Sequence, residues 1–316
     1  MAITKEASDT GVNNLPVCYT PSARDAFRRI LKQLNFSNSE YILLPAYVGI
    51  TDKEGSGVFD PVRGLGLKYD FYKVDNKLEF DYKDIEKNIK EKKVKALLVI
   101  HYFGFLRKGM GKLRQLCNKE KIILIEDCAH AMDSFYHKRA YTNIGKTGDF
   151  SFYSIHKYLP TKDGGFYTYK SDFNLNPDVD GGGNISYETL FRAHMADYDK
   201  IRNKRIANYK YMLGMLQKTS KYYSILYPNL PKGVVPLNLP VIIHNKNREK
   251  LYFKLIDKKV MVIALYYRMI EQIDKNKFPV SYAISESILN FPTHQDIEKT
   301  DIKYMIDSFN NVLLEL

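Results

Sequence analysis

Short apolar runs alternate with longer amphipathic stretches through the first half of the chain. The apolar runs have the length and the aromatic and β-branched content of buried strands. They cover residues 41–47, 69–75, 95–104, 121–131, 149–155 and 164–170. Between several of them, apolar residues recur at helical spacing, in residues 22–34, 80–93 and 108–120. Strands that alternate with helices imply right-handed crossovers and a mainly parallel sheet, with ligands at the carboxyl ends of its strands.

The pattern changes after residue 175. A loop rich in Gly and Asp is expected over residues 176–184, and a long helix over residues 188–218. The rest of the chain mixes short strands, such as residues 234–243, with helices, of which the last covers residues 301–316. Strand character is therefore concentrated before the long helix.

This change in the pattern of predicted strands and helices indicates two domains. We expect a large, α/β sheet domain over residues 1–205 and a smaller C-terminal α+β domain over residues 206–316. A chain of 316 residues is long enough to bury a core in each of them.

The composition is that of a globular protein, since 45% of the residues are hydrophobic and 27% are charged. The longest nearly apolar run, residues 96–106, is shorter than the ~20 residues that span a bilayer. The N-terminus has no basic start followed by an apolar core, so it does not read as a secretory signal. The cysteines Cys18, Cys117 and Cys128 are odd in number and lack metal-ligand spacing, which favours reduced thiols in a cytoplasmic protein.

The net charge of +12 favours an anionic partner. The positive charge is spread along the chain, and its densest group, residues 87–95, carries a glutamate and is typical of a solvated helix end. No zinc knuckle, aromatic RNA-binding motif or basic zipper accompanies it. We therefore expect an anionic small molecule, and neither nucleic acid nor a membrane, as the partner.

Asp127 belongs to the segment IEDCAH, residues 125–130, and four of the five residues that precede it are aliphatic. Its carboxylate is expected at the sheet edge where ligands bind. One interpretation is that Asp127 caps a following helix. The other is that a buried carboxylate faces a cation such as a protonated pyridine nitrogen, which makes the ring a better electron sink.

Ser22 and Arg24 stand at the start of the amphipathic stretch 22–34. Backbone N–H groups and the helix dipole favour an anion at such a position. The alternative is that Ser22 serves only as the N-cap of the helix.

The stretch FSFYSIHKYLPTKDGG, residues 150–165, offers three basic side chains after a predicted strand: His156, Lys157 and Lys162. A lysine can form an imine with an aldehyde cofactor and later act as a base, whereas a histidine cannot form the imine. Lys162 lies too close to the Gly-Gly turn for this role. The alternative for any single lysine is an ordinary surface position.

Other catalytic signatures are missing from the sequence. It has no GxxxxGK[ST] motif and no HExxH motif, and the GSG at residues 55–57 lacks the third glycine of a dinucleotide-binding fingerprint. A nucleotide hydrolase or a metalloprotease therefore has no support, and we predict no metal site.

Taken in order, these segments resemble the DegT/DnrJ/StrS family of sugar aminotransferases, which are fold type I enzymes that depend on pyridoxal 5'-phosphate (PLP). The resemblance spans nearly the whole chain. It rests on the amphipathic stretch 22–34, the strand that ends in Pro-Ala-Tyr (45–47), HYFG (101–104), IEDCAHA (125–131), FSFY…DGG (150–165) and SESILNFPTHQDI (285–297).

The resemblance implies PLP as the cofactor and a set of residues that bind it. Asp127 would pair with the pyridine nitrogen, and His130 would lie next to the ring. The residues implied to hold the phosphate are Ser22, Ala23 and Arg24 at the helix start, together with Ser151 or Ser154.

The catalytic lysine of the family would come from residues 150–165. A gap-free match to Phe-Ser-Phe-x-x-x-Lys puts His156 at the lysine position. Counting back from Asp-Gly-Gly, or matching the subgroup pattern Ser-x-Arg-Lys-x-x-Pro-x-x-Asp-Gly-Gly, puts Lys157 there. We favour Lys157 because chemistry on PLP normally needs an imine-forming amine.

The implied activity is transfer of an amino group, with glutamate as the expected donor, to a nucleotide-linked keto-sugar by a homodimer. One alternative is a sugar 3-dehydratase in which His156 is the base and the cofactor is not covalently bound. Another is a homologue that has lost catalysis and serves as a binding or regulatory protein. Two departures from the family motivate it. One is a shorter region over residues 170–200. The other is Gly49, followed by the insertion TDKEGSG (51–57), where members commonly place an aromatic residue that stacks on the ring; Tyr47 or another element of the chain would then cover the ring face.

Overall fold

A seven-stranded sheet organises the first half of the chain. The computed structural model describes residues 15–136, 142–173, 175, 183–216, 220–245 and 247–316. The strands lie in the order β1 (Val17–Thr20), β9 (Gly165–Tyr169), β8 (Phe150–Ser154), β5 (Ile123–Asp127), β4 (Val94–Ile100), β2 (Tyr41–Pro45) and β3 (Lys68–Tyr72). From β8 to β3 all neighbours are parallel, whereas β9 runs antiparallel to β8 and to β1. The predicted α/β fold with a mainly parallel sheet is confirmed.

The three helices predicted between these strands are present. They are α1 (Ala23–Gln33), α3 (Tyr82–Glu91) and α4 (Met110–Glu120). The apolar side of α1, which includes Phe27 and Ile30, is buried, and this helix packs on β8 and β9. The short helix α2 (Phe59–Gly64) and the edge strand β1 were not predicted, because both are too short to show a clear period.

The predicted strand over residues 95–104 ends earlier, at Ile100. HYFG continues as His101 and a 3₁₀ turn, η1 (Tyr102–Gly104). Phe103 has a φ of 58°, a left-handed conformation that no strand contains. Two further short strands, β6 (Phe135–Tyr136) and β7 (Thr142–Asn143), pair with each other.

The prediction of a single helix over residues 188–218 is wrong, because the structure has two helices there. α5 (Tyr187–Met195) ends before Ala196, and α6 (Tyr198–Met215) begins after Asp197. The side chain of Asp197 accepts a hydrogen bond from the backbone N–H of Lys200 at 2.9 Å, which makes Asp197 an N-cap that starts a new helix. Of the predicted loop 176–184, residues 176–182 lie outside the described residues.

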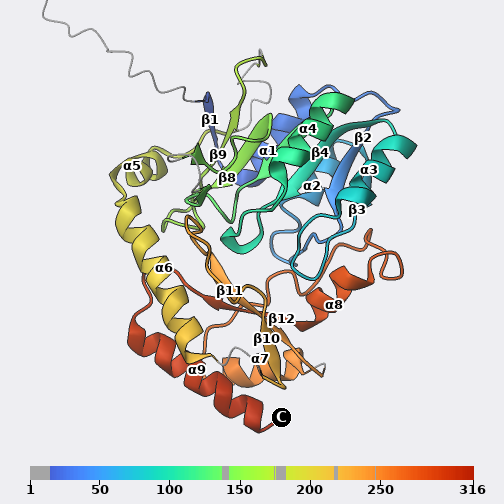
Figure 1. Cartoon of the computed structure of the whole chain (residues 1–316). Helices are drawn as coiled ribbons and strands as arrows, with labels where there is room; N and C mark the ends of the chain where they lie inside the picture. Colours follow the sequence, from blue (N-terminus) through green and yellow to red (C-terminus); the bar gives the residue numbers. More distant parts are fainter. Residues whose placement is uncertain (1–14, 137–141, 174, 176–182, 217–219, 246) are drawn as a thin grey trace, which may run out of the picture.

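The C-terminal part forms a second, antiparallel sheet. Its strands are β10 (Tyr223–Ile225), β11 (Asn238–Ile243) and β12 (Ile288–Pro292), and its helices are α7 (Arg248–Asp257), α8 (Pro279–Ser287) and α9 (Lys299–Leu314). In Figure 1 this sheet lies below the larger one, with α6 and α9 side by side along its outer side. The predicted domain boundary at 205/206 falls inside α6, and the division into two domains stays a prediction. Across the described segments, the helices are all too short or too polar to cross a bilayer.

Gly165 marks a close approach between β9 and the start of α1. A Cβ added there would lie 2.3 Å from the carbonyl carbon of Ser22 and 2.4 Å from the nitrogen of Ala23. Because both atoms belong to the backbone, neither can move aside cheaply, and only glycine fits between the strand and the helix start.

We therefore expect Gly165→Ala to lower the free energy of unfolding by about 2 kcal/mol, through overpacking. Urea unfolding followed by circular dichroism measures the change. Gly214→Ala in α6 is the matched control, because nothing lies within 4 Å of its added Cβ. It should raise stability by about 0.5–1 kcal/mol, since alanine favours a helix more than glycine does. Equal unfolding midpoints for the two variants would contradict this account.

Candidate active site

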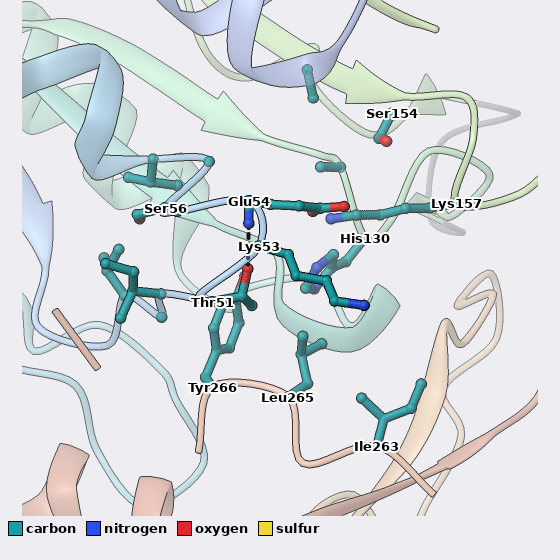
Figure 2. A pocket seen from close by; sticks show the side chains of 18 of the residues that line it. Thr51, Lys53, Glu54, Ser56, His130, Ser154, Lys157, Ile263, Leu265 and Tyr266 are labelled. Atoms are coloured by element: carbon teal, nitrogen blue, oxygen red, sulfur yellow. Dashed lines mark hydrogen bonds between the residues drawn. The ribbon is translucent and has the colours of Figure 1, made fainter. Parts of the chain in front are cut away.

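A cavity of about 1060 Å³ lies at the carboxyl ends of the parallel strands. Its lining includes Ile100 from the end of β4, Asp127 from the end of β5 and Ser154 from the end of β8. The start of α1, the loop after β2, the start of α7 and residues 262–267 complete the wall. This is the edge at which a parallel sheet binds its ligands. Figure 2 shows side chains from the loop after β2, from the end of β8 and from residues 263–266 facing one cavity.

Asp127 is buried at the end of β5 and lines the cavity. Its Oδ1 accepts a hydrogen bond from the backbone N–H of Ala129 at 2.9 Å. Residues 129–133 form turns rather than a helix, so Asp127 is not a helix cap. Burial raises the pKa of its carboxyl, and the positive charge of Lys157 works against that rise. The carboxylate is thus placed where a cation would stabilise its charged form.

The neighbouring Glu126 forms a buried pair with His101 from the HYFG segment. The two side chains meet at 2.8 Å, between His101 Nε2 and Glu126 Oε2. His101 Nδ1 accepts the backbone N–H of Arg107 at 3.2 Å, so the ring carries its proton on Nε2 and donates it to Glu126. Cys128 lies close to this pair, but both ring nitrogens are already engaged, which leaves none to bind a metal. The pair ties the ends of β4 and β5 together and so fixes the position of Asp127.

His130 is buried between two aromatic rings. Its ring centroid lies 6.1 Å from that of Phe103 and 5.9 Å from that of Tyr266, with interplanar angles of 25° in both cases. Its Nδ1 accepts the backbone N–H of Phe103 at 3.3 Å. Burial, helped by the positive charge of Lys157, holds its pKa well below the usual range. His130 is therefore a neutral imidazole that lines the cavity.

Lys157 and His156 follow β8, and both line the cavity. Lys157 is half-buried, and Figure 2 shows its side chain reaching toward Glu54, above His130. Burial lowers the pKa of its amine, and the negative charges of Asp127 and Glu54 partly offset this. His156 is exposed, and its ring lies 3.4 Å from the hydroxyl of Ser154.

Arg205 holds the backbone at Lys157, although sequence reasoning did not single it out. This buried side chain donates from Nη2 to the carbonyl of Lys157 at 3.1 Å, and its guanidinium lies 4.6 Å from the centroid of the Tyr158 ring. Gln295, in the late segment 285–297, accepts from Arg205 Nε at 3.2 Å and donates to the carbonyl of Tyr158 at 2.9 Å. The Tyr158 hydroxyl in turn donates to the carbonyl of His130 at 2.8 Å. α6 and the segment after β12 thus fix the turn that presents Lys157.

The start of α1 forms another part of the wall. Ser22 is the N-cap: its hydroxyl accepts the backbone N–H of Asp25 at 3.1 Å and donates to the Asp25 carboxylate at 2.6 Å. Ala23 and Arg24 line the cavity beside it. Arg24 donates from Nη2 to the carbonyl of Glu54, and within the described residues its buried Nε has no hydrogen-bond partner. A helix start with an arginine and an unused donor suits an anion.

Of the two serines predicted near the phosphate, the structure brings only Ser154 to the cavity. Ser151 is buried elsewhere, and its hydroxyl donates to the carbonyl of Gly145 at 2.6 Å. The two residues are three positions apart on β8, and successive side chains of a strand point to opposite faces.

The loop of residues 51–57 also lines the cavity, although none of its residues was predicted to belong to the site. Thr51 and Gly55 exchange backbone hydrogen bonds of 3.1 and 2.9 Å, and Glu54 donates its N–H to the Thr51 hydroxyl at 3.1 Å (Figure 2). An ion pair of 2.5 Å between Asp52 and Arg268 ties the loop to the C-terminal part. This closed turn carries Glu54 toward Lys157.

The comparison with protein families finds one match. The family model described as the DegT/DnrJ/EryC1/StrS aminotransferase family matches residues 30–175 and 189–310, which is most of the chain.

Two curated relatives are similar to parts of the chain. GDP-perosamine synthase of Vibrio cholerae is 30% identical over 99 residues, which cover 31% of this chain and about a quarter (26%) of that protein. The dTDP-3-amino-3,6-dideoxy-alpha-D-galactopyranose transaminase of Aneurinibacillus thermoaerophilus is 20% identical over 257 residues, 74% of this chain and 70% of that protein.

Solved structures resemble the whole fold. The PMP form of the putative sugar aminotransferase Spr1654 from Streptococcus pneumoniae has a TM-score of 0.79 at 16% identity, and the match covers 95% of this chain and 88% of that one. Helicobacter pylori PseC, an aminotransferase involved in the biosynthesis of pseudoaminic acid, has a TM-score of 0.77 at 16% identity, with 95% and 87% covered. At these identities the match shows the fold, which is the fold type I arrangement predicted from the sequence.

We expect the Lys157 amine to react with acetic anhydride at a lower pH than an ordinary lysine, because burial lowers its pKa from 10.5. The measurement is peptide mass spectrometry of protein freed of small molecules and labelled with limiting reagent across a pH series. Half-maximal labelling of Lys157 should fall below pH 10.5. Glu54→Gln removes a negative charge that raises this pKa, so it should move the midpoint further down. A midpoint at or above 10.5, or an upward shift in Glu54→Gln, would contradict the assignment.

Proposed function

The chain belongs to the DegT/DnrJ/EryC1/StrS aminotransferase family, and from that premise we propose that it transfers an amino group from glutamate to a nucleotide-linked keto-sugar. One observation carries the proposal: a lysine, a buried carboxylate and a helix start, which come from three separate segments, line a single cavity. The family uses PLP, and similar solved structures are PLP and PMP forms of a putative sugar aminotransferase.

The residues present fit PLP. The phosphate would be held by the start of α1, with Ala23 and Arg24, and by Ser154. The Nε of Arg24, which has no hydrogen-bond partner in the described part of the chain, offers a donor for it. The buried carboxylate of Asp127, whose pKa burial raises, would gain a cationic partner in the pyridinium nitrogen. Lys157 would bind the aldehyde carbon. The cavity is larger than such a cofactor alone requires, which leaves room for a second substrate.

Each of these side chains then has a definite task. Bound PLP supplies an electron sink for the reacting carbon. Asp127 would keep the proton on the ring nitrogen. Lys157 Nζ would act as the general base that moves a proton at the reacting carbon, and burial favours its neutral form for this purpose. Arg205, through the Lys157 carbonyl, would keep the amine oriented.

The charge of the cavity wall supports a phosphorylated sugar substrate. Lys53, Lys162 and Arg248 line the cavity and provide positive charge from three different segments. The diphosphate of a nucleotide-linked sugar is an anion of matching sign. Glutamate as donor rests on the resemblance alone, and cytoplasmic location stays a prediction.

The position of Lys157 favours it over His156 as the catalytic residue. The Lys157 amine interacts electrostatically with Asp127 and His130, whereas the groups facing His156 are Lys157, Glu54 and Asp163. His156 nevertheless lines the cavity, where the partial loss of water around its ring and the charge of Lys157 lower its pKa, so it could accept a proton there. This observation keeps the dehydratase as the second candidate. A homologue without catalysis would have no need to bring Lys157 and Asp127 together.

The decisive test is borohydride reduction of the protein with bound PLP, followed by peptide mapping. We expect PLP to be fixed covalently to Lys157, and Lys157→Ala to lose both this label and about 10²- to 10⁴-fold of amine transfer from glutamate. Lys162→Ala is the matched control, because this lysine also lines the cavity yet should still allow the labelling of Lys157. Non-covalent PLP in the natural protein, with activity lost in His156→Ala, would favour the dehydratase instead.

We also propose that the protein is a homodimer. α5 exposes Tyr187, Phe191 and Met195, which are 91%, 66% and 65% accessible and lie on one side of the helix at a spacing of four residues. Such an exposed apolar patch is typical of a protein interface.

Phe191→Glu should weaken self-association, because it places a charge in the apolar patch. Light scattering after size-exclusion chromatography at several protein concentrations gives the molar mass. It should fall from twice the mass of one chain in the natural protein toward the mass of one chain in the variant. Met261→Glu, at another exposed apolar side chain outside α5, should leave the mass unchanged. A natural protein of single-chain mass at all concentrations would refute the dimer.

A further inference from the structure

The loop after β2 and a segment of the C-terminal part share one small space. Gly49 forms a β-bridge with Met269, and the N–H of Ile50 donates to the carbonyl of Arg268 at 3.0 Å. This pairing brings the ring of Tyr266 over Gly49: a Cβ added to Gly49 would lie 1.9 Å from Tyr266 Cδ1. The aromatic ring therefore occupies the volume that any side chain at position 49 would need.

Tyr266 is held in this place by its neighbours. Its ring meets Tyr47 and Tyr102 edge to face, at centroid distances of 5.4 and 6.1 Å. On another side it stacks on His130, with an interplanar angle of 25°. Its φ of 63° is left-handed, a conformation that a tyrosine keeps only where the surroundings enforce it.

The rest of the ring is part of the cavity wall. Tyr266 is half-buried and lines the cavity together with Asp127 and Lys157. Figure 2 shows it rising from residues 263–266 toward Thr51, on the side of the cavity where His130 lies. Burial raises the pKa of its hydroxyl, and the charge of Asp127 adds to the rise, so the ring is neutral and close to that carboxylate.

Tyr47 cannot take this position. It is completely buried, it is not part of the cavity wall, and it contacts the ring of Tyr266 edge to face.

We propose that Tyr266 provides the aromatic face on which the pyridine ring of the cofactor stacks. This inference rests on the proposed function, since it assigns a further binding residue to the same PLP site. A flat, electron-poor ring that pairs with Asp127 gains from an aromatic surface beside it, in addition to the area that it buries. The C-terminal part of the chain thereby contributes directly to cofactor affinity, and Gly49 is required because any side chain would displace this ring.

Pyridoxamine phosphate (PMP) is the probe for the test. It has no aldehyde and cannot bond to Lys157, so its affinity reports only contacts to the ring, the amine and the phosphate. Equilibrium dialysis of the full-length protein, freed of cofactor, measures its dissociation constant without an activity assay.

Tyr266→Ala should weaken PMP binding by about tenfold, whereas Tyr266→Phe should stay within about twofold of the natural protein, because it keeps the ring. Tyr304→Ala, at an exposed tyrosine of α9 away from the cavity, is the matched control. Tyr266→Leu keeps apolar bulk without an aromatic face and serves if the alanine variant does not fold. Natural affinity in the leucine variant would overturn the proposal.

A double-mutant cycle tests whether a side chain at position 49 acts by displacing the ring of Tyr266. Gly49→Ala alone should weaken PMP binding, since the added Cβ pushes the Tyr266 ring away. In the Tyr266→Ala background the same change should cost less than about twofold, because the ring is no longer there to displace. Independent, multiplying effects would show that the two positions do not act through one ring.

The outcomes separate this inference from the proposed function. A natural protein that binds neither PMP nor PLP refutes the aminotransferase itself. A natural protein that binds PMP, with Tyr266→Ala and Tyr266→Leu binding equally well, refutes only the role of Tyr266.

Discussion

The proposed site depends on the burial of a carboxylate next to an amine. Asp127 and Lys157 lie at the ends of neighbouring strands, and burial pushes both of their pKa values toward the neutral forms, while each group partly restores the charge of the other. Burying two such groups destabilises the folded protein unless their geometry is fixed and other groups form hydrogen bonds to them. Much of the surrounding structure does this. The His101–Glu126 pair fixes the strand ends that present Asp127, and Arg205 holds the carbonyl of Lys157.

The C-terminal part lines one side of the cavity and also hydrogen-bonds the turn that carries Lys157. Residues 262–267 form one wall, Gln295 anchors the turn after β8, and α6 supplies Arg205. A relative displacement of the two sheets would therefore disturb the lysine, the aromatic ring of Tyr266 and the loop of residues 51–57 together, because the Asp52–Arg268 ion pair also joins them.

Much of the fold could be predicted from local pattern. Buried parallel strands read as continuous apolar runs, and each predicted strand of the large sheet is present, although the strand over 95–104 ends at Ile100. The predicted helix and strand bounds are wrong where a single residue sets the local backbone conformation. Asp197 starts a new helix inside an uninterrupted helical pattern, and Phe103 takes a left-handed conformation that its side chain does not favour. Short elements such as β1 and α2 were missed because their stability comes from packing, which leaves little trace in four to six residues.

The sequence alone determined the sheet and its ligand-binding edge, and the resemblance assigns to that edge Asp127, His130, the helix start at Ser22 and either Lys157 or His156. These assignments depend on periods and motifs along a continuous segment. Only the tertiary structure decided which serine of β8 faces the cavity, that Glu54 approaches Lys157, and that Tyr266 fills the space above Gly49. Gly49 and Tyr266 are far apart in sequence, and no local pattern links them. Their contact arises because the C-terminal part pairs with the loop after β2, and the energy of that pairing comes from many residues at once.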